Sequence, residues 1–290
     1  MYKFEEKLWI RGAGDLASGV AARLYRSGFS IIMSELPVPM TVRRSVAFSP
    51  AVYRGESEVE GIRAVFCKDL SEALAALKKG LIAVVADPEG SLCREYAPDI
   101  LIDAIMAKKN LGTKPEDAGI VIALGPGFEA GKDCHAVIET KRGHNLGRAL
   151  YRGRAEENTN IPGNIAGYDK ERVIRAGKDG IFSSGRRIGD MVKKGELIAY
   201  SGEEPIYAAI DGVIRGLLQD GVYAKEGLKC GDIDPRGKIE SCYTISDKAY
   251  AIAGGVLEAV LYLMRGREKK ESRDGADSFG CGTKQKIRGE

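Results

Sequence analysis

Residues 7–36 read KLWIRGAGDLASGVAARLYRSGFSIIMSEL. An apolar run leads into a glycine-rich loop, and the apolar residues at positions 16, 20, 21 and 24 then recur at the spacing of one helix face. Gly28 is a helix stop signal, and a second apolar run follows over residues 29–35. The stretch therefore predicts a strand, a tight loop, a helix and a second strand, which together form a βαβ unit.

The alternation of strand and helix patterns continues beyond this unit. The later patterns are a strand at 62–66, a helix at 69–79 and strands at 81–86, 99–103, 119–127 and 134–140. Alternating strands and helices favour a parallel sheet that is covered by helices on both faces. We therefore expect residues 1–165 to form a Rossmann-like α/β domain with a parallel sheet.

The second half of the chain contains an internal repeat. Residues 188–195 and 220–227 match at an offset of 32, with two glycines at matching positions in each segment. The pattern resembles the barrel-sandwich hybrid fold of biotinyl and lipoyl domains. Those domains present a modified lysine on the hairpin between their two halves, whereas residues 200–205 here, YSGEEP, contain no lysine. We expect residues 166–240 to form a mainly-β barrel-sandwich hybrid module without a modified lysine.

Residues 250–264 form the most apolar run in the later part of the chain. The run contains Glu258 and is shorter than the about 20 residues that a bilayer span needs. We expect residues 241–266 to supply a helix that packs on the N-terminal domain. The charged and glycine-rich residues 267–290 are expected to form a disordered tail.

Composition argues against several classes of protein. The 44 basic and 41 acidic residues leave a formal net charge of +3, and no dense basic stripe occurs, so a nucleic-acid partner is not expected. The N-terminal segment is too polar for a signal peptide. The six cysteines include no CxxC pair, so we expect reduced thiols and no structural metal. We therefore expect a cytoplasmic protein without a membrane partner.

The glycine-rich loop is the first candidate binding site. In a dinucleotide-binding unit, glycines let the backbone approach a pyrophosphate, and an acidic residue about 20 positions further on binds the ribose. Gly12, Gly14 and Glu35 fit these roles, and Gly19 belongs to the same glycine-rich stretch. Asp15 is also predicted as a cofactor-binding residue that orients polar groups together with Glu35, although its charge would repel an anion at this position. The alternative is a tight strand-to-helix turn with a different use of ligands.

Three arginines are candidates for holding an anionic group. Arg43 and Arg44 follow a proline-containing turn after the second predicted strand, and Arg142 lies in a later turn. A guanidinium can bind a phosphate or a carboxylate through two parallel hydrogen bonds. The alternative is that these side chains are solvated at the surface.

Both histidines of the chain lie in residues 132–148, KDCHAVIETKRGHNLGR. On a strand, Cys134 and His135 point to opposite faces, which disfavours a cysteine–histidine nucleophile and favours Cys134 as a core residue. His135, Glu139 and His144 could instead meet at one strand end, where a histidine oriented by a carboxylate transfers protons or binds a metal. We therefore predict these three residues as a catalytic group, against the alternative of a strand and turn without chemistry.

Several segments together resemble one protein family. They are IRGAGDLASG (10–19), the arginines at 43 and 44, DAIMAKKNLG (103–112), LGPGF (124–128), IETKRGHNLGR (138–148) and GDIDPR (231–236). In combination they are similar to the accessory proteins of selenium-dependent molybdenum hydroxylases, a family often called YqeB, over residues 8–265. The N-terminal part is also distantly similar to maturation proteins of the XdhC type.

The resemblance implies a cytoplasmic accessory factor for molybdenum cofactor maturation or selenium insertion, with the hydroxylase and its maturation proteins as partners. The factor would bind a small anionic ligand, and the cofactor is left open between a nucleotide and a molybdopterin-type molecule. Two alternatives remain: an NAD(P)-dependent enzyme that uses the glycine-rich loop, and a non-catalytic scaffold for a hydroxylase. Whether the protein is an enzyme and whether it forms a homo-oligomer stay open.

Overall fold

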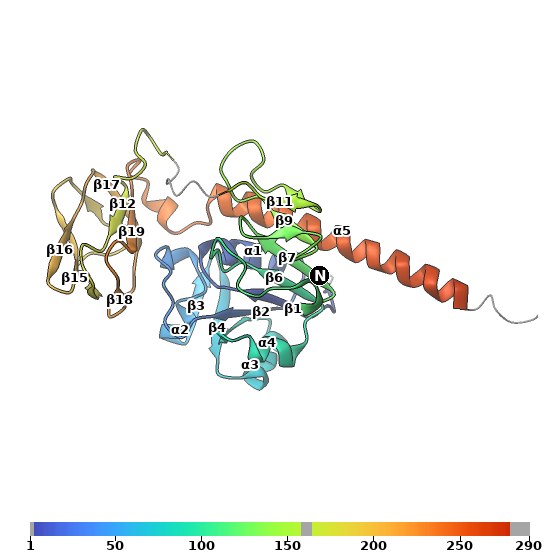
Figure 1. The fold of residues 1–290 in the computed structure, drawn as a ribbon. Helices are drawn as coiled ribbons and strands as arrows, with labels where there is room; N and C mark the ends of the chain where they lie inside the picture. Colours follow the sequence, from blue (N-terminus) through green and yellow to red (C-terminus); the bar gives the residue numbers. More distant parts are fainter. Residues whose placement is uncertain (1–2, 158–163, 279–290) are drawn as a thin grey trace, which may run out of the picture.

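The computed structural model describes residues 3–157 and 164–278 (Figure 1). Within these ranges the chain forms one large sheet with helices on both faces, a region of short antiparallel strands, and a long final helix. Figure 1 shows the β-rich region beside the large sheet, with the final helix running back across the sheet and beyond it.

The large sheet contains nine strands in the order β10-β9-β7-β6-β1-β2-β5-β4-β3. The strands are β1 (Leu8–Arg11), β2 (Ile31–Glu35), β3 (Glu56–Val59), β4 (Ile62–Cys67), β5 (Ile82–Ala86), β6 (Ile100–Asp103), β7 (Ile120–Leu124), β9 (Ala136–Ile138) and β10 (Ala149–Leu150). The inner strands are parallel to one another, whereas β3 and β10 pair antiparallel with their neighbours at the two edges. The sheet is therefore mixed.

Helices and short turns surround this sheet. The helical elements are α1 (Asp15–Arg26), α2 (Ala51–Arg54), α3 (Leu70–Lys78), α4 (Ser91–Tyr96) and α5 (Asp247–Ser278), with the 3-10 turns η1 (Arg44–Val46), η2 (Pro115–Asp117) and η3 (Ile239–Cys242). The short strands β8 (Glu129–Ala130) and β11 (Gly153–Arg154) pair with each other as a separate ribbon.

This topology corrects the predicted fold class. In a Rossmann-like unit the third parallel strand lies beside the second, but here β5 lies between β2 and β4. The chain reverses between β3 and β4 in a two-residue turn, in which Glu60 and Gly61 have positive φ of 48° and 79°. Apolar patterns predict where strands lie but not their order or direction. The prediction of a Rossmann-like parallel sheet is therefore wrong.

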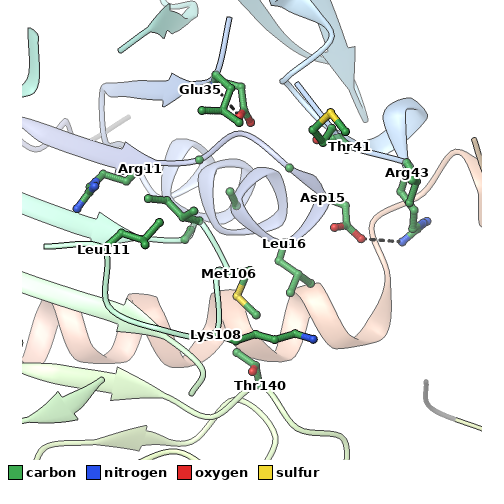
Figure 2. A pocket seen from close by; sticks show the side chains of 18 of the residues that line it. Arg11, Asp15, Leu16, Glu35, Thr41, Arg43, Met106, Lys108, Leu111 and Thr140 are labelled. Atoms are coloured by element: carbon green, nitrogen blue, oxygen red, sulfur yellow. Dashed lines mark hydrogen bonds and ion pairs between the residues drawn. The ribbon is translucent and has the colours of Figure 1, made fainter. Parts of the chain in front are cut away.

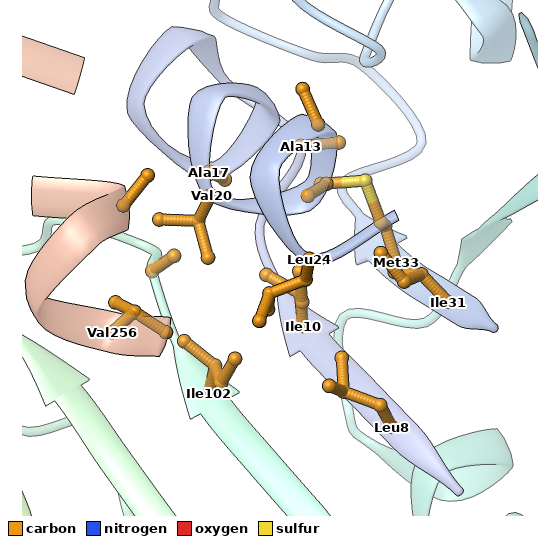
Figure 3. Close-up of a cluster of buried hydrophobic side chains, with 14 of the residues drawn as sticks. Leu8, Ile10, Ala13, Ala17, Val20, Leu24, Ile31, Met33, Ile102 and Val256 are labelled. Carbon is orange, nitrogen blue, oxygen red and sulfur yellow. The ribbon is translucent and has the colours of Figure 1, made fainter. Parts of the chain in front are cut away.

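The central strand β1 contributes to two separate apolar cores, because successive side chains of a strand point to opposite faces. Leu8 and Ile10 pack with α1 and α5 on one face of the sheet (Figure 3). Trp9 packs with α3 and α4 on the other face. All three side chains are fully buried, so the loop that follows β1 starts from a rigid position at the centre of the sheet.

The β-rich region consists of two four-stranded antiparallel sheets, in the orders β12-β19-β17-β14 and β16-β15-β13-β18. The strands are β12 (Val173–Arg175), β13 (Gly180–Ser183), β14 (Met191–Val192), β15 (Leu197–Ser201), β16 (Glu204–Tyr207), β17 (Gly212–Leu217), β18 (Tyr223–Ala224) and β19 (Lys229–Asp234). Their apolar side chains form a third core, separate from the two cores of the large sheet. The predicted assignment to the barrel-sandwich hybrid class is corrected to two antiparallel sheets that enclose one core.

The internal repeat corresponds to two equivalent short strands, β14 and β18. Gly189 and Gly221, which precede these strands, both adopt positive φ, 100° and 85°. Gly189 donates its N–H to the Ile214 carbonyl at 2.8 Å, and Gly221 donates to the Phe182 carbonyl at 2.9 Å. The repeat therefore encodes the places where the chain turns. It does not encode which strands pair, which is why it was a poor guide to the fold class.

The first part of α5 is a core helix of the large sheet. Ile252, Val256 and Val260 are fully buried in the same core as α1. The loop between β9 and β10 crosses α5 at two glycines, where a Cβ on Gly255 would lie 1.9 Å from the carbonyl oxygen of Gly147. Glycine at position 255 therefore permits the backbone of this loop to touch the helix.

One helix of the described ranges, Asp247–Arg267, is long and apolar enough to cross a membrane by length and composition alone. Core helices of soluble proteins pass the same test, and the buried face of α5 is that of a core helix. The first part of α5 therefore serves as a core helix of the large sheet. The helix continues to Ser278, past the predicted end at residue 266, so the first part of the predicted disordered tail is helical. Residues 279–290 lie outside the described residues.

Candidate functional site

A cavity of about 1150 Å³ opens at the carboxyl ends of β1, β2 and β6 (Figure 2). Its walls include the loops that follow these three strands, together with residues after β7 and β9 and the start of α5. The chain passes from β1 to β2 on one side, and β6 lies on the other side of β1, so the cavity lies where the strand order reverses. Open parallel sheets form a ligand crevice at such a switch point. This cavity, called the cleft below, is the candidate site.

The glycine-rich loop forms one edge of the cleft. Gly12 has a positive φ of 98°, and an added Cβ would lie 2.9 Å from the carbonyl oxygen of Ala104 after β6. Gly12 is therefore required by the turn and by the close approach of two loops. Gly14 precedes α1 in extended conformation, and an added Cβ would meet only Thr41 within 4 Å, at 3.6 Å. The backbone at Gly14 is accordingly open to a ligand.

Glu35 supports the glycine-rich loop from the end of β2. Its two carboxylate oxygens accept hydrogen bonds from the backbone N–H of Ala13 (3.0 Å) and of Leu36 (2.8 Å). Burial raises the pKa of Glu35, and these two hydrogen bonds oppose the rise. The predicted ribose-binding residue therefore lines the cleft, but it also holds the loop in place.

The charge of Asp15 at the start of α1 is balanced by Arg43. The Asp15 Oδ2 and Arg43 Nη1 atoms are 3.6 Å apart, and the two side chains are shown at one end of the cleft in Figure 2. Arg43 also donates to the carbonyl oxygens of Ser241 (3.2 Å) and Thr244 (3.4 Å). The predicted repulsion by Asp15 is thereby reduced, while Arg43 has less capacity left for a ligand.

Two residues predicted to bind a cofactor have structural contacts instead. Arg44 donates through Nε to the Leu217 carbonyl at 2.6 Å and through Nη1 to Gln219 at 2.7 Å, which joins η1 to the end of β17. Gly19 lies on α1, where an added Cβ would be 2.8 Å from the Cβ of Ala249 on α5. Neither residue is part of the cleft wall. Arg44 therefore fixes the β-rich region, and Gly19 permits the close contact of two helices.

Arg142 lies at the cleft and binds the first turn of α5. Its two terminal nitrogens donate to the two oxygens of Asp247 at 2.8 and 2.9 Å. This hydrogen-bonded pair lowers the pKa of Asp247 well below its usual range. Arg142 thus holds the start of α5 against the loop after β9. Because its guanidinium is already paired with Asp247, it has less capacity left for the predicted anionic ligand.

His135 lies away from the cleft. Its ring Nδ1 accepts a hydrogen bond from the backbone N–H of Val121 at 2.9 Å. The backbone N–H of His135 donates to the Val121 carbonyl at 2.8 Å. Both residues are at the amino ends of the parallel strands β7 and β9, whereas the cleft is at the carboxyl ends. Burial lowers the pKa of His135, as a neutral acceptor requires. The structure therefore gives His135 no place in the predicted catalytic group.

The other members of that group are separated as well. Glu139 is 3 % exposed, and its carboxylate accepts from the N–H groups of Lys141 (2.7 Å) and Glu156 (2.8 Å). His144 is exposed in the following turn and is not part of the cleft wall. Cys134 is a core residue, as expected, and burial raises the pKa of its thiol to about 12. The predicted convergence of His135, Glu139 and His144 does not occur.

Several residues of the cleft wall were not predicted from the sequence. Arg11 and Asp87 stand at or directly after the carboxyl ends of β1 and β5, a position that the strand pattern could have revealed. Lys229 of β19 and Lys248 of α5 reach the cleft from segments far along the chain, and no local pattern marks them. Burial and the nearby Arg142 lower the pKa of Lys248.

The loop after β6 forms the apolar side of the cleft. Ile105, Met106 and Leu111 lie along its wall, and Met106 packs against the same apolar core as Leu16. Met106 and Lys108 adopt positive φ of 63° and 61°, which costs non-glycine residues free energy and is frequent in ligand-binding loops. The cleft thus combines an apolar wall with charged ends.

The thiols and carboxylates of the described residues form no metal centre. No group of three or more histidine, cysteine, aspartate or glutamate residues in the described ranges could hold a metal ion. Five cysteines are described, and all five are free thiols; Cys281 lies outside the described residues.

The chain is similar to a protein of Escherichia coli K12 named "Uncharacterized protein YqeB". The two are 53% identical over 255 residues, which cover 88% of this chain and 47% of the relative. The chain thus spans about half the length of the relative, whose name assigns no function. No known protein-family model matches the chain.

Two solved structures show only weak likeness. An aspartoacylase family protein from Mesorhizobium loti is 7% identical, with 75% of this chain and 60% of that chain covered and a TM-score of 0.24. A succinylglutamate desuccinylase from Silicibacter sp. TM1040 is 12% identical, with coverages of 80% and 85% and a TM-score of 0.23. Likeness at this level supports no conclusion on fold or activity. The expectation of a link to molybdenum and selenium is corrected to this extent: no comparison supports it, and it rests on the sequence resemblance alone.

Proposed function

We propose that the cleft binds a small nucleotide-like molecule that carries an anionic group. The observation that carries this proposal is the position of the cleft: it opens at the switch point of the large sheet, beside a loop whose glycines leave the backbone exposed to a ligand. Both features support the binding of a ligand that touches main-chain groups.

The size and lining of the cleft agree with such a ligand. Its volume of about 1150 Å³ is slightly above the range for small-molecule sites, which is roughly 300–1,000 Å³, so the cleft has room for a nucleotide-sized molecule. Apolar side chains from the loop after β6 offer a surface for a flat ring. Seven basic and five acidic residues line the cleft, an excess that favours an anionic ligand.

In this proposal the protein is an accessory factor, and the bound molecule is its ligand. The alternative, hydride transfer from a dinucleotide, is less well supported because Asp15 and Glu35 already have structural partners beside the loop. The link to a hydroxylase stays a prediction from the sequence resemblance. The free thiols of the described cysteines support a cytoplasmic location.

A bulky substitution in the cleft tests the proposal. Ile105 is 39% exposed and lines the cleft, so Ile105→Trp fills the cavity without disturbing a core. We expect titration calorimetry with AMP, CMP, GMP, UMP and NAD⁺ to show saturable binding of at least one compound. Ile105→Trp should weaken that binding at least about tenfold, or about 1.4 kcal/mol.

A matched control uses the same substitution on another face. Leu74 of α3 is 44% exposed and lies outside the cleft wall, so Leu74→Trp should leave the affinity unchanged. The proposal fails if none of the five compounds binds, or if both tryptophan variants bind as the unaltered protein does.

A further inference from the structure

The two ends of the cleft carry different side chains. Figure 2 shows Glu35 on one side of the glycine-rich loop and Lys108 beside Thr140 on the other, with Leu16 and Met106 between them. Asp87 belongs to the Glu35 end, and Arg142 and Lys248 lie at the α5 end. A ligand that spans the cleft therefore meets two different chemical environments.

Lys248 dominates the cationic end. It is half-buried in the first turn of α5 and lies within electrostatic range of Arg142, Asp15, Glu139 and Asp247. Each of these four has another partner: Arg142 and Asp247 bind each other, Asp15 pairs with Arg43, and Glu139 accepts two backbone N–H groups.

No ion pair of Lys248 itself occurs in the described residues, whereas two other lysines of the cleft wall do form pairs. Lys141 is 2.7 Å from Glu156, and Lys229 is 3.8 Å from Asp232. A half-buried ammonium group without a carboxylate partner is costly, and a bound oxyanion would offset that cost. Burial and Arg142 lower the pKa of Lys248, which agrees with such an unbalanced position.

The opposite end of the cleft offers hydrogen-bond acceptors. Asp87 is 8% exposed, and its Oδ2 accepts from the N–H of Cys93 at 3.0 Å. The N–H of Asp87 donates to the Glu35 carbonyl at 3.2 Å, which places the two acidic residues side by side. Arg11, a cation of the cleft wall at the end of β1, pairs with Asp103 at 3.4 Å and donates to Thr113. This end therefore suits hydroxyl or amino donors rather than an anion.

We infer that the ligand is a phosphomonoester that lies across the glycine-rich loop. Its phosphate binds Lys248 at the α5 end, and its hydroxyl or amino groups donate to the carboxylate of Asp87 at the other end, whose Oδ1 has no hydrogen bond within the described residues. The apolar wall between the two ends accepts a flat ring. A nucleoside monophosphate has this order of groups. The inference rests on the proposed function and adds to it the direction of the ligand and the residue that binds its phosphate.

The experiment uses titration calorimetry to compare adenosine, cytidine, guanosine and uridine with their 5′-monophosphates, AMP, CMP, GMP and UMP. In the unaltered protein the monophosphate should bind more tightly than the nucleoside. Lys248→Met should lower the affinity for the monophosphate by about 10- to 100-fold, which is the range for losing a hydrogen bond to a charged group. The same substitution should leave the affinity for the nucleoside unchanged, so the preference for the monophosphate over the nucleoside disappears.

Three further variants separate the two ends. Lys248→Arg keeps the charge and should retain the phosphate preference, which also shows that position 248 tolerates substitution. Lys141→Met removes a paired and exposed cleft lysine and should have little effect on the preference. Asp87→Asn should lower the affinities for the nucleoside and for the monophosphate by the same factor, because Asp87 lies at the end of the cleft that does not bind the phosphate.

The outcomes distinguish this inference from the proposed function. If no nucleoside or nucleotide binds the unaltered protein, the proposed function fails. If a monophosphate binds and Lys248→Met keeps the full preference for phosphate, the inference is overturned while the proposed function stands. The same conclusion follows if Lys141→Met abolishes the preference and Lys248→Met does not.

Discussion

Glu139 shows how a polar residue singled out by its type can have a purely structural task. The sequence places an acidic residue between two histidines, which suggests proton transfer. In the structure its carboxylate accepts hydrogen bonds from two backbone N–H groups, that of Lys141 in the turn after β9 and that of Glu156 after β11. Residue type and spacing therefore predicted a reactive group where the backbone needed an acceptor. The partners of a side chain come from segments that no local pattern reveals.

The hydrogen bond of His135 predicts a pH dependence of stability. Burial lowers the pKa of His135 in the folded protein below its value in the unfolded chain, about 6.5. The contribution of His135 is therefore present above about pH 6.5 and is lost as the pH falls through the folded pKa. His135→Asn keeps an acceptor near Nδ1 but cannot take up a proton. Urea unfolding between pH 7 and pH 5 should show a smaller loss of stability for this variant than for the unaltered protein.

The exposed imidazole provides the control for this measurement. His144 is exposed, and its imidazole makes no such hydrogen bond to any described residue, so His144→Asn should follow the pH profile of the unaltered protein. Parallel profiles for the unaltered protein and His135→Asn would contradict the assigned role of His135.

At the scale of elements, periodicity predicted positions better than pairing. Strand patterns at 81–86 and 99–103 coincide closely with β5 and β6, and the helix pattern at 69–79 coincides with α3. The hairpin of β3 and β4 was missed, although a two-residue turn ending in Gly61 marks it. The strand order could not be predicted, because it depends on which apolar faces meet in the folded chain.

Two adjacent glycines of α5 allow a direct test of the contact between the β9–β10 loop and the helix. Gly255→Ala would place a Cβ 1.9 Å from the Gly147 carbonyl oxygen, whereas a Cβ on Gly254 would be 3.6 Å from the nearest atom, on Arg23. We expect Gly255→Ala to lower the free energy of unfolding by more than about 2 kcal/mol. Gly254→Ala should raise it by about 0.5–1 kcal/mol, because alanine loses less entropy in a helix.

Urea denaturation of both variants measures these changes through the midpoint of unfolding. The account of the loop crossing would be contradicted if Gly255→Ala were as stable as Gly254→Ala.

At the scale of the whole molecule, the cleft depends on parts that are distant in sequence. The glycine-rich loop was predictable from the opening residues of the chain, since it follows the first strand pattern. Lys229 and Lys248 reach the same cleft because Arg43 and Arg44 tie the loop after β2 to the β-rich region and to the segment before α5. These contacts explain why sequence reasoning found the glycine edge of the site and missed its lysines.

The most direct test of the central claim is the location of a bound nucleotide. Amide chemical-shift mapping by NMR, with the tightest-binding mononucleotide, reports which backbone groups it touches. Shifts concentrated at Gly14, Ile105 and Thr140, together with the start of α5 near Lys248, are the predicted result. Shifts confined to the outer sheet of the β-rich region, β16-β15-β13-β18, or to the amino ends of the strands near His135, would contradict the claim that the cleft is the binding site.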